Sequence, residues 1–363
     1  MKVVHVTALV TQGAGSNLAI GGLGRFLEEI VPAQQRVGLD VETVEISQTA
    51  LESVAQAIAS NDWNSLKRIG RDIVGNTRAD IFHLHDWYGA VVLDHLFQQG
   101  HRAIVATSHL PLRRGFTYRD SGLNWNAKSL LESRCLHAVK RVSAPSIYVK
   151  RFLVEEYGLA ENRIDVIPHG VNCVDFKFDG SLQSVIGQPR LLAVGRITDQ
   201  KGFELLVRTM PIILASEPTA KLTIVGDGGA RESLARLIVD LELENTVTIK
   251  TGKTKFELVA EYGNASLLII PSQFEPFGLV GLEAMACGCP VLAITPTGAS
   301  EYLEPFELTS SYRIAELGKA ILKRIHQLRL SVEPRQDVRL RAEQMPWEKA
   351  AEAYANLYSK VVQ

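Results

Sequence analysis

The chain has 363 residues, which is more than a single hydrophobic core usually serves, so two domains are expected. Apolar residues make up 46% of the sequence, which excludes a disordered chain, and the net charge of −1 provides no overall field to recruit nucleic acid. The apolar start lacks a signal-peptide cleavage site, and no apolar run approaches the roughly 18 residues of a membrane span, so a cytoplasmic protein is expected.

Short apolar runs alternate with helical patterns along the whole chain. The expected strands are 3–10, 41–46, 81–84, 103–107, 141–144, 164–167, 190–194, 221–225, 246–249, 267–270 and 291–294. The expected helices between them are 24–37, 88–98, 130–140, 149–157, 203–214, 231–240 and 256–263. The strand-like runs are continuous rather than alternating, as in strands buried on both faces, so they predict an α/β fold with doubly wound parallel sheets.

The pattern restarts near residue 190, after the polar, Gly/Pro-bearing segment 176–190. We therefore expect two Rossmann-like domains, 1–175 and 190–335, followed by a final helical segment at 345–363. Four scattered cysteines without a second ligand pair are expected to be free thiols rather than a metal site.

The segment 271–289, PSQFEPFGLVGLEAMACGC, carries the most chemical information. Glu275 lies in a loop after an apolar strand, Gly278 opens an apolar helical run, and Glu283 lies within that run. A helix N-terminus suits a diphosphate, and a carboxylate can accept hydrogen bonds from two sugar hydroxyls. Glu283 could also be a surface charge, although its apolar neighbours argue against full exposure.

The segment 193–202, AVGRITDQKG, places Arg196 and Lys201 after a strand of the second domain. Cations at the carboxyl end of a parallel sheet lie where α/β proteins bind ligands, and two of them can neutralise a leaving diphosphate. A solvated basic loop is the alternative, and these two residues alone do not decide between the two interpretations.

Three motifs of the first domain follow its strands. Gly21 and Gly22 precede a helix in GGLGRF, either to admit a phosphate or as simple turn residues, and the G-x-G-x-x-G dinucleotide fingerprint is not completed. Asp86 lies in HLHDWYG, where His83 and His85 suggest a metal site that nothing nearby completes. His109 lies in ATSHLP, and a lone histidine is usually structural.

The spacing of Glu275 and Glu283 resembles the E-x7-E signature of retaining GT-B glycosyltransferases of family GT4, also called glycosyl transferase group 1, with features similar to glycogen and starch synthases. The resemblance covers nearly the whole chain. It implies two Rossmann-like domains that face each other across a cleft, with the final helix crossing back to the first domain. The implied reaction is metal-independent transfer of a hexosyl unit from a nucleotide diphosphate sugar, with UDP favoured, to an acceptor hydroxyl with retention of configuration.

The resemblance also implies roles for individual residues. Glu275 would contact the donor hexose and Glu283 the ribose, while Arg196 and Lys201 would clamp the diphosphate. The remaining donor-side residues would be Gly21, Gly22, Gly226, Phe277, Gly278 and Leu279. Asp86 and His109 would lie on the acceptor or sugar side, so the implied catalytic set is Glu275, His109, Arg196 and Lys201.

No D-x-D motif occurs, which agrees with a site that needs no metal and no cofactor besides the nucleotide sugar. Two alternatives stay open, namely a nucleotide-sugar 2-epimerase on the same fold and a non-catalytic sugar-nucleotide-binding protein. Residues 113–151 hold nine Lys/Arg and two Asp/Glu, which indicates either a solvated face or contact with an anionic acceptor or the inner membrane surface. The acceptor class (glycan, lipid or small molecule) and the oligomeric state are not specified by the sequence.

Overall fold

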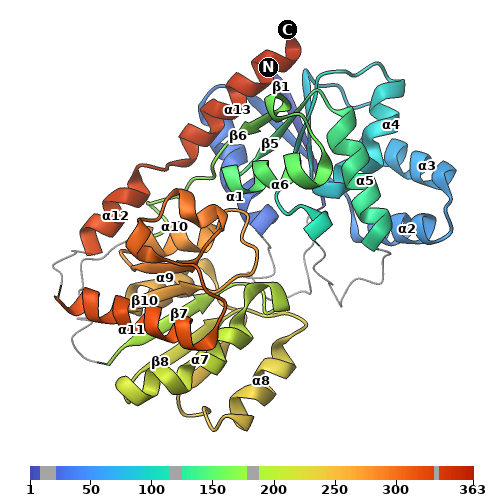
Figure 1. Ribbon diagram of the computed structural model, residues 1–363. Helices are drawn as coiled ribbons and strands as arrows, with labels where there is room; N and C mark the ends of the chain where they lie inside the picture. The colour runs from blue at the N-terminus through green and yellow to red at the C-terminus, as the bar shows by residue number, and fades with distance from the viewer. Residues whose placement is uncertain (9–21, 115–124, 178–187, 331–334) are drawn as a thin grey trace. The chain divides into compact units, whose positions relative to one another are not determined.

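The computed structural model describes residues 1–8, 22–114, 125–177, 188–330 and 335–363 (Figure 1). These residues form two units. The first unit comprises the described residues up to His169 together with Trp347–Gln363, and the second comprises those of Gly170–Pro346. Each unit contains one six-stranded parallel sheet with helices around it, so the expected α/β class with two doubly wound sheets is confirmed.

The sheet of the first unit has the order β2-β1-β3-β4-β5-β6. Its strands are β1 (Lys2–Thr7), β2 (Asp40–Glu45), β3 (Ile81–His85), β4 (Ile104–Thr107), β5 (Arg141–Ala144) and β6 (Ile164–Val166). The strand order reverses direction between β1 and β3, and ligands of open α/β sheets bind outside the carboxyl ends of strands at such a switch point. The register there places His5 opposite His83.

The helices of the first unit are α1 (Gly22–Arg36), α2 (Gln48–Ala59), α3 (Trp63–Val74), α4 (Ala90–Gln98), α5 (Trp125–Ala138), α6 (Ile147–Tyr157) and α13 (Trp347–Val362). The expected set lacked α2 and α3. Both begin at a side chain that accepts a backbone N–H, Ser47 for α2 and Asp62 for α3, and these caps are the sequence signal that predicts them. The helix α13 packs on α1 and β4 and buries Tyr354 and Tyr358.

The sheet of the second unit has the order β12-β11-β10-β7-β8-β9. Its strands are β7 (Arg190–Val194), β8 (Lys221–Val225), β9 (Val247–Lys250), β10 (Leu267–Ile270), β11 (Val291–Ile294) and β12 (Leu308–Thr309). The switch point lies between β7 and β10. The edge strand β12 was not expected, because it has only two residues and shows no apolar run of its own.

The helices of the second unit are α7 (Phe203–Ser216), α8 (Arg231–Asp240), α9 (Lys255–Asn264), α10 (Leu279–Ala286), α11 (Ile314–Leu330) and α12 (Arg335–Glu343). Every residue of β10 and β11 is buried, as expected for strands covered on both faces. This packing fixes the carboxyl ends of β7 and β10, from which the motif-bearing loops start.

Candidate active site

In the second unit, the loops after β7 and β10 are joined by a buried glutamine. Gln200 donates from Nε2 to the carbonyl of Phe274 at 2.9 Å, and its own carbonyl accepts the N–H of Gln273 at 2.8 Å. A buried amide needs partners, and Gln200 finds them on the neighbouring loop. Gln200 therefore holds the loop with Lys201 and the loop with Glu275 together. The sequence did not reveal this role.

Glu275 and Lys201 meet at the centre of this arrangement. Lys201 Nζ lies 2.7 Å from Glu275 Oε2, and Ser272 Oγ donates to the same oxygen at 3.0 Å. Glu275 is only 6% exposed, so its carboxylate is held by fixed donors rather than by water. A carboxylate oriented in this way is suited to accept hydrogen bonds from the hydroxyls of a bound ligand.

Two glycines allow the backbone around Glu275 to pack closely. Gly202 has φ +67°, and a Cβ there would lie 2.1 Å from the Pro271 carbonyl oxygen. Gly298 donates its N–H to the Glu275 carbonyl at 2.7 Å, and a Cβ there would lie 1.9 Å from the Pro276 carbonyl oxygen. No other residue fits these contacts, so the glycines fix the position of the glutamate.

The helix α10 starts directly after this loop. Gly278, with φ +85°, is its N-cap, and Tyr302 Oη donates to the Gly278 carbonyl at 2.6 Å. Leu279 is the first residue of α10, so its N–H lies at a helix N-terminus, which suits an anion, whereas the N–H of Gly281 donates to the Gly278 carbonyl at 2.8 Å. Phe277 is buried and its ring packs against Tyr302, so this residue offers only its backbone to a ligand.

Glu283 lies one turn into α10 and is 5% exposed, which rules out the interpretation as a surface charge. Tyr262, a fully buried residue of α9, donates from its hydroxyl to Glu283 Oε2 at 2.9 Å. The sequence analysis missed Tyr262, since nothing in the local pattern of α9 distinguishes it from an ordinary core residue. The hydrogen bond fixes the rotamer of a carboxylate that would otherwise be costly to bury.

The loops after β7 and β8 also touch. A Cβ on Gly226 would lie 1.8 Å from the Gly195 carbonyl oxygen, so packing alone requires glycine at position 226. Arg196 is exposed on the loop between Gly195 and Lys201. The second unit thus brings Lys201, Glu275 and Gly278 together, with Arg196 on the same loop as Lys201.

In the first unit, Asp86 and His109 lie at the carboxyl ends of β3 and β4 and are linked. Asp86 has φ +50°, unusual for a residue with a side chain, and its Oδ1 accepts the N–H groups of His109 at 2.6 Å and Leu110 at 3.3 Å. Burial raises the pKa of Asp86 to about 7. Backbone strain of this kind often marks a functional site. Gly22 begins α1, and Gly21 lies outside the described residues.

The ring nitrogens of His5, His83 and His85 lie within 4.8 Å of one another, a grouping that could in principle hold a metal. The sequence analysis noticed His83 and His85 and missed His5, which only the register of β1 and β3 brings near.

Every ring nitrogen of this trio has a hydrogen-bond partner. Those of His5 pair with Gln34 and His85, those of His83 with Tyr358 and Thr107, and the second nitrogen of His85 pairs with His109. Burial lowers the pKa of His5 to about 4 and the pKa values of His83 and His85 well below 6.5. The geometry fits a network of neutral imidazoles better than a metal centre, since a metal would have to displace these bonds.

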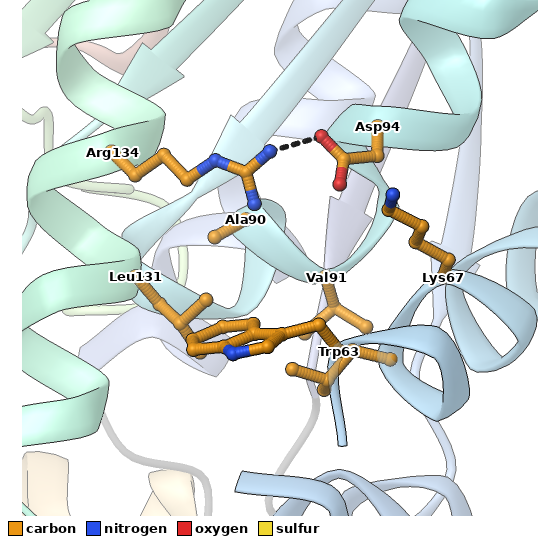
Figure 2. A pocket seen from close by; sticks show the side chains of 8 residues that line it. Trp63, Lys67, Ala90, Val91, Asp94, Leu131 and Arg134 are labelled. Carbon is orange, nitrogen blue, oxygen red and sulfur yellow. Dashed lines mark hydrogen bonds and ion pairs between the residues drawn. The ribbon is translucent and has the colours of Figure 1, made fainter. Parts of the chain in front are cut away.

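A separate hollow of about 200 Å³ lies between α3, α4 and α5 of the first unit. Figure 2 shows the indole of Trp63 beside Leu131, with Arg134 directed at Asp94 across from it. The two charged groups pair with each other, and none of the residues expected in the site lines the hollow. We therefore place the candidate active site at the strand ends and not here.

Three cations of the basic stretch 113–151 form ion pairs within the first unit. Arg134 pairs with Asp94, Arg141 with Asp165, and Lys150 with Glu161 at 3.3 Å. Lys140 donates to the Val361 carbonyl at 2.7 Å. These contacts favour a structural role for these four side chains. None of the described helices combines the length and the apolar character needed to cross a membrane.

Comparison with known proteins shows which families this chain resembles. The family model described as Glycosyltransferase Family 4 matches residues 20–174, and the one described as Glycosyl transferases group 1 matches residues 177–344. An uncharacterized glycosyltransferase of Methanocaldococcus jannaschii is 31% identical over 66% of this chain, and the match spans 63% of that relative's length. A D-inositol 3-phosphate glycosyltransferase of Pseudarthrobacter chlorophenolicus is 26% identical over 82% of this chain and 79% of its own length.

Two solved structures share the fold over 99% of the chain. Sucrose-phosphate synthase from Thermosynechococcus elongatus aligns with a TM-score of 0.82 at 20% identity, covering 99% of this chain and 98% of that one. The Anabaena protein HepE, solved in complex with UDP and glucose, aligns with a TM-score of 0.74 at 20% identity, covering 99% and 100%. The sheets, the motif geometry and the two matching family models lead to one conclusion: the chain belongs to glycosyltransferase family 4, the glycosyl transferases group 1, and has the GT-B fold.

Proposed function

We propose that the protein transfers a hexosyl unit from a nucleoside diphosphate sugar to an acceptor hydroxyl, with retention of configuration and without a metal ion. The observation that carries the proposal is the ion pair of the partly buried Lys201 with the buried Glu275 at the N-terminus of α10. It combines a cation for a phosphate, a carboxylate for sugar hydroxyls and a helix N-terminus in one place.

In this proposal the bond between the anomeric carbon and the diphosphate oxygen breaks as the acceptor oxygen approaches from the same face. The acceptor proton passes to an oxygen of the departing diphosphate. Arg196 and Lys201 stabilise the charge that develops on the leaving group, where preorganised cations have their largest effect. Glu275 orients the hexose through its hydroxyls and forms no covalent bond.

UDP is the favoured nucleotide, because HepE, which shares the fold, was solved with UDP and glucose. Asp86 and His109 of the first unit are proposed to contact the sugar or the acceptor, and the strained backbone at Asp86 supports a functional role there. Glu283, fixed by Tyr262, is proposed to bind the ribose.

The first test is a thermal-shift screen with UDP-, GDP- and ADP-hexoses, since a ligand that binds only the folded state raises the melting temperature. We expect one nucleotide class to stand out. The anomeric configuration of the transferred sugar is then read by NMR with a simple acceptor. An inverted product, or the absence of stabilisation by every nucleotide sugar, would refute the proposal.

A further inference from the structure

A chain of hydrogen bonds runs from α1 to the candidate sugar side of the first unit. Gln34 Oε1 lies 2.8 Å from His5 Nε2, His5 Nδ1 lies 2.8 Å from His85 Nε2, and His85 Nδ1 lies 3.0 Å from His109 Nε2. Gln34, His5 and His85 are fully buried, whereas His109 is 9% exposed. His109 is therefore the end of the chain that a ligand can reach.

The polarity of this chain follows from elementary hydrogen-bond chemistry. A neutral imidazole has one N–H donor and one acceptor nitrogen. Because Gln34 offers a carbonyl oxygen, the proton of His5 must be on Nε2, and its Nδ1 must accept from His85 Nε2. In the same way His85 Nδ1 accepts from His109 Nε2. The proton of His109 is thus on Nε2, and Nδ1 carries the lone pair.

The amide of Gln34 is itself held in place. Its Nε2 donates to Tyr358 Oη on α13 at 2.9 Å, which leaves Oε1 for His5. All three imidazoles are neutral near pH 7, because burial keeps the pKa values of His5, His85 and His109 low. A charged imidazole would have two N–H donors and no acceptor, which would interrupt this chain of hydrogen bonds.

We propose that Gln34 is a positioning residue that fixes His109 in its Nε2–H form through His5 and His85, so that His109 Nδ1 accepts a hydrogen bond from a sugar hydroxyl. The contact with a sugar rests on the proposed function, whereas the tautomer of His109 does not. The device gives specificity: His109 selects a group that donates a hydrogen bond and disfavours one that can only accept.

The tautomer is measured directly by long-range proton–nitrogen NMR of protein labelled with [15N]histidine. The His109 signals are identified by their loss in His109→Asn. We expect a single Nε2–H form of His109 in the unmodified protein and mixed tautomers in Gln34→Leu. The matched control is Thr107→Val, which removes a partner of His83 in the same buried network but lies off the chain to His109. It should leave the His109 signals unchanged.

An Nδ1–H form of His109 in the unmodified protein would overturn the proposal whether or not Gln34→Leu folds. So would a Gln34→Leu spectrum identical to that of the unmodified protein. If Thr107→Val changed the His109 signals as much as Gln34→Leu does, the network would be merely structural and the proposal would fail.

The sugar contact is tested with donors in which one hydroxyl is replaced by fluorine, which cannot donate a hydrogen bond. We expect one position at which this replacement lowers kcat/KM about tenfold, the effect of one lost hydrogen bond of about 1.4 kcal/mol. The penalty should disappear in Gln34→Leu and remain in Thr107→Val. If no nucleotide sugar is a substrate while His109 keeps its Nε2–H form, the proposed function fails and the role of Gln34 stands. Equal penalties in Gln34→Leu and the unmodified protein would refute selection of a donor group by His109.

Discussion

Lys201 Nζ lies 2.7 Å from Glu275 Oε2, and the two side chains are only 19% and 8% exposed. An ion pair so far withdrawn from water depends on both partners, since removing one leaves an uncompensated charge. The pair also keeps the ammonium beside the N-terminus of α10, where an anionic ligand is favoured. The Lys201 ammonium and the Glu275 carboxylate therefore stabilise each other and are also the two groups proposed to bind the diphosphate and the sugar.

The first prediction concerns the diphosphate clamp. Lys201→Ala and Arg196→Ala are each expected to lower kcat by about 100-fold or more, because charge stabilisation acts mainly in the transition state. Steady-state kinetics measure the effect. Lys253→Ala removes a partly buried ion pair with Glu257, away from the clamp in the same unit, and serves as the control, with near-normal turnover. Near-normal kcat in both clamp variants would remove them from the mechanism.

A second prediction concerns pH and Asp86. Burial raises the pKa of Asp86 to about 7 from its usual 3.8, so the neutral form is favoured in the folded state. The stability that this contributes is complete below about pH 4 and is lost as the pH rises through about 7. Relative to Asp86→Asn, which cannot ionise, the unmodified protein should lose up to about 4 kcal/mol over this range.

Differential scanning calorimetry of both proteins between pH 4 and 8 tests this. Taking the difference between the two proteins removes most contributions from titrating groups that do not interact with Asp86; the buried Glu132, whose pKa is raised by burial and by the Asp86 charge, is not one of these. A difference in melting temperature that is constant with pH, or that grows in favour of the unmodified protein as the pH rises, would contradict the assignment.

The sequence was sufficient for every described strand except β12 and for the E-x7-E loop, because continuous apolar runs and glycine-bounded motifs are local signals. It was insufficient for partners that come from distant segments. Tyr262 and Gln200 look like ordinary residues of a helix and a turn, and only packing shows that they bind Glu283 and the Phe274 carbonyl. His5 joins the other histidines through strand register, which no single strand specifies.

A third prediction concerns metal. Transferase activity is expected to survive EDTA, because the cations proposed for the leaving group are protein side chains and the ring nitrogens of the buried histidine trio already have hydrogen-bond partners. Activity is compared before and after chelation and dialysis. Loss of turnover that Mg²⁺ or Mn²⁺ restores would show that a divalent ion takes part.

The fourth prediction concerns Gly298. Alanine there would place Cβ 1.9 Å from the Pro276 carbonyl oxygen, so the loop must move and the bond from Gly298 N–H to the Glu275 carbonyl is lost. We expect Gly298→Ala to weaken donor binding at least tenfold and to lower the melting temperature. Gly263→Ala is the matched control, because nothing lies within 4 Å of a Cβ there. Within α9, it should stabilise by up to about 1 kcal/mol. Normal donor affinity in Gly298→Ala would show that Glu275 does not depend on this contact.

The last prediction separates the two glutamates and their supports. Contacts to ribose change little as the glycosidic bond breaks, whereas contacts to the hexose can strengthen as its ring flattens. Uniform binding lowers KM, and binding specific to the transition state raises kcat. Glu283→Gln should therefore mainly raise donor KM, and Glu275→Gln should mainly lower kcat while leaving the affinity for the free nucleoside diphosphate nearly unchanged.

Tyr262→Phe extends this test, because it removes only the hydroxyl that donates to Glu283 at 2.9 Å. It should raise donor KM about three- to tenfold, consistent with the loss of one hydrogen bond of about 0.7–1.4 kcal/mol, and leave kcat unaltered. It should also reduce the preference for ribose over 2′-deoxyribose in the nucleotide. Combined with Glu283→Gln, its effect should be less than additive, since both changes disrupt the same contact. Calorimetric binding of the free diphosphate completes the measurement. If Glu275→Gln abolishes that binding while Glu283→Gln and Tyr262→Phe do not, the two glutamates have the reverse roles.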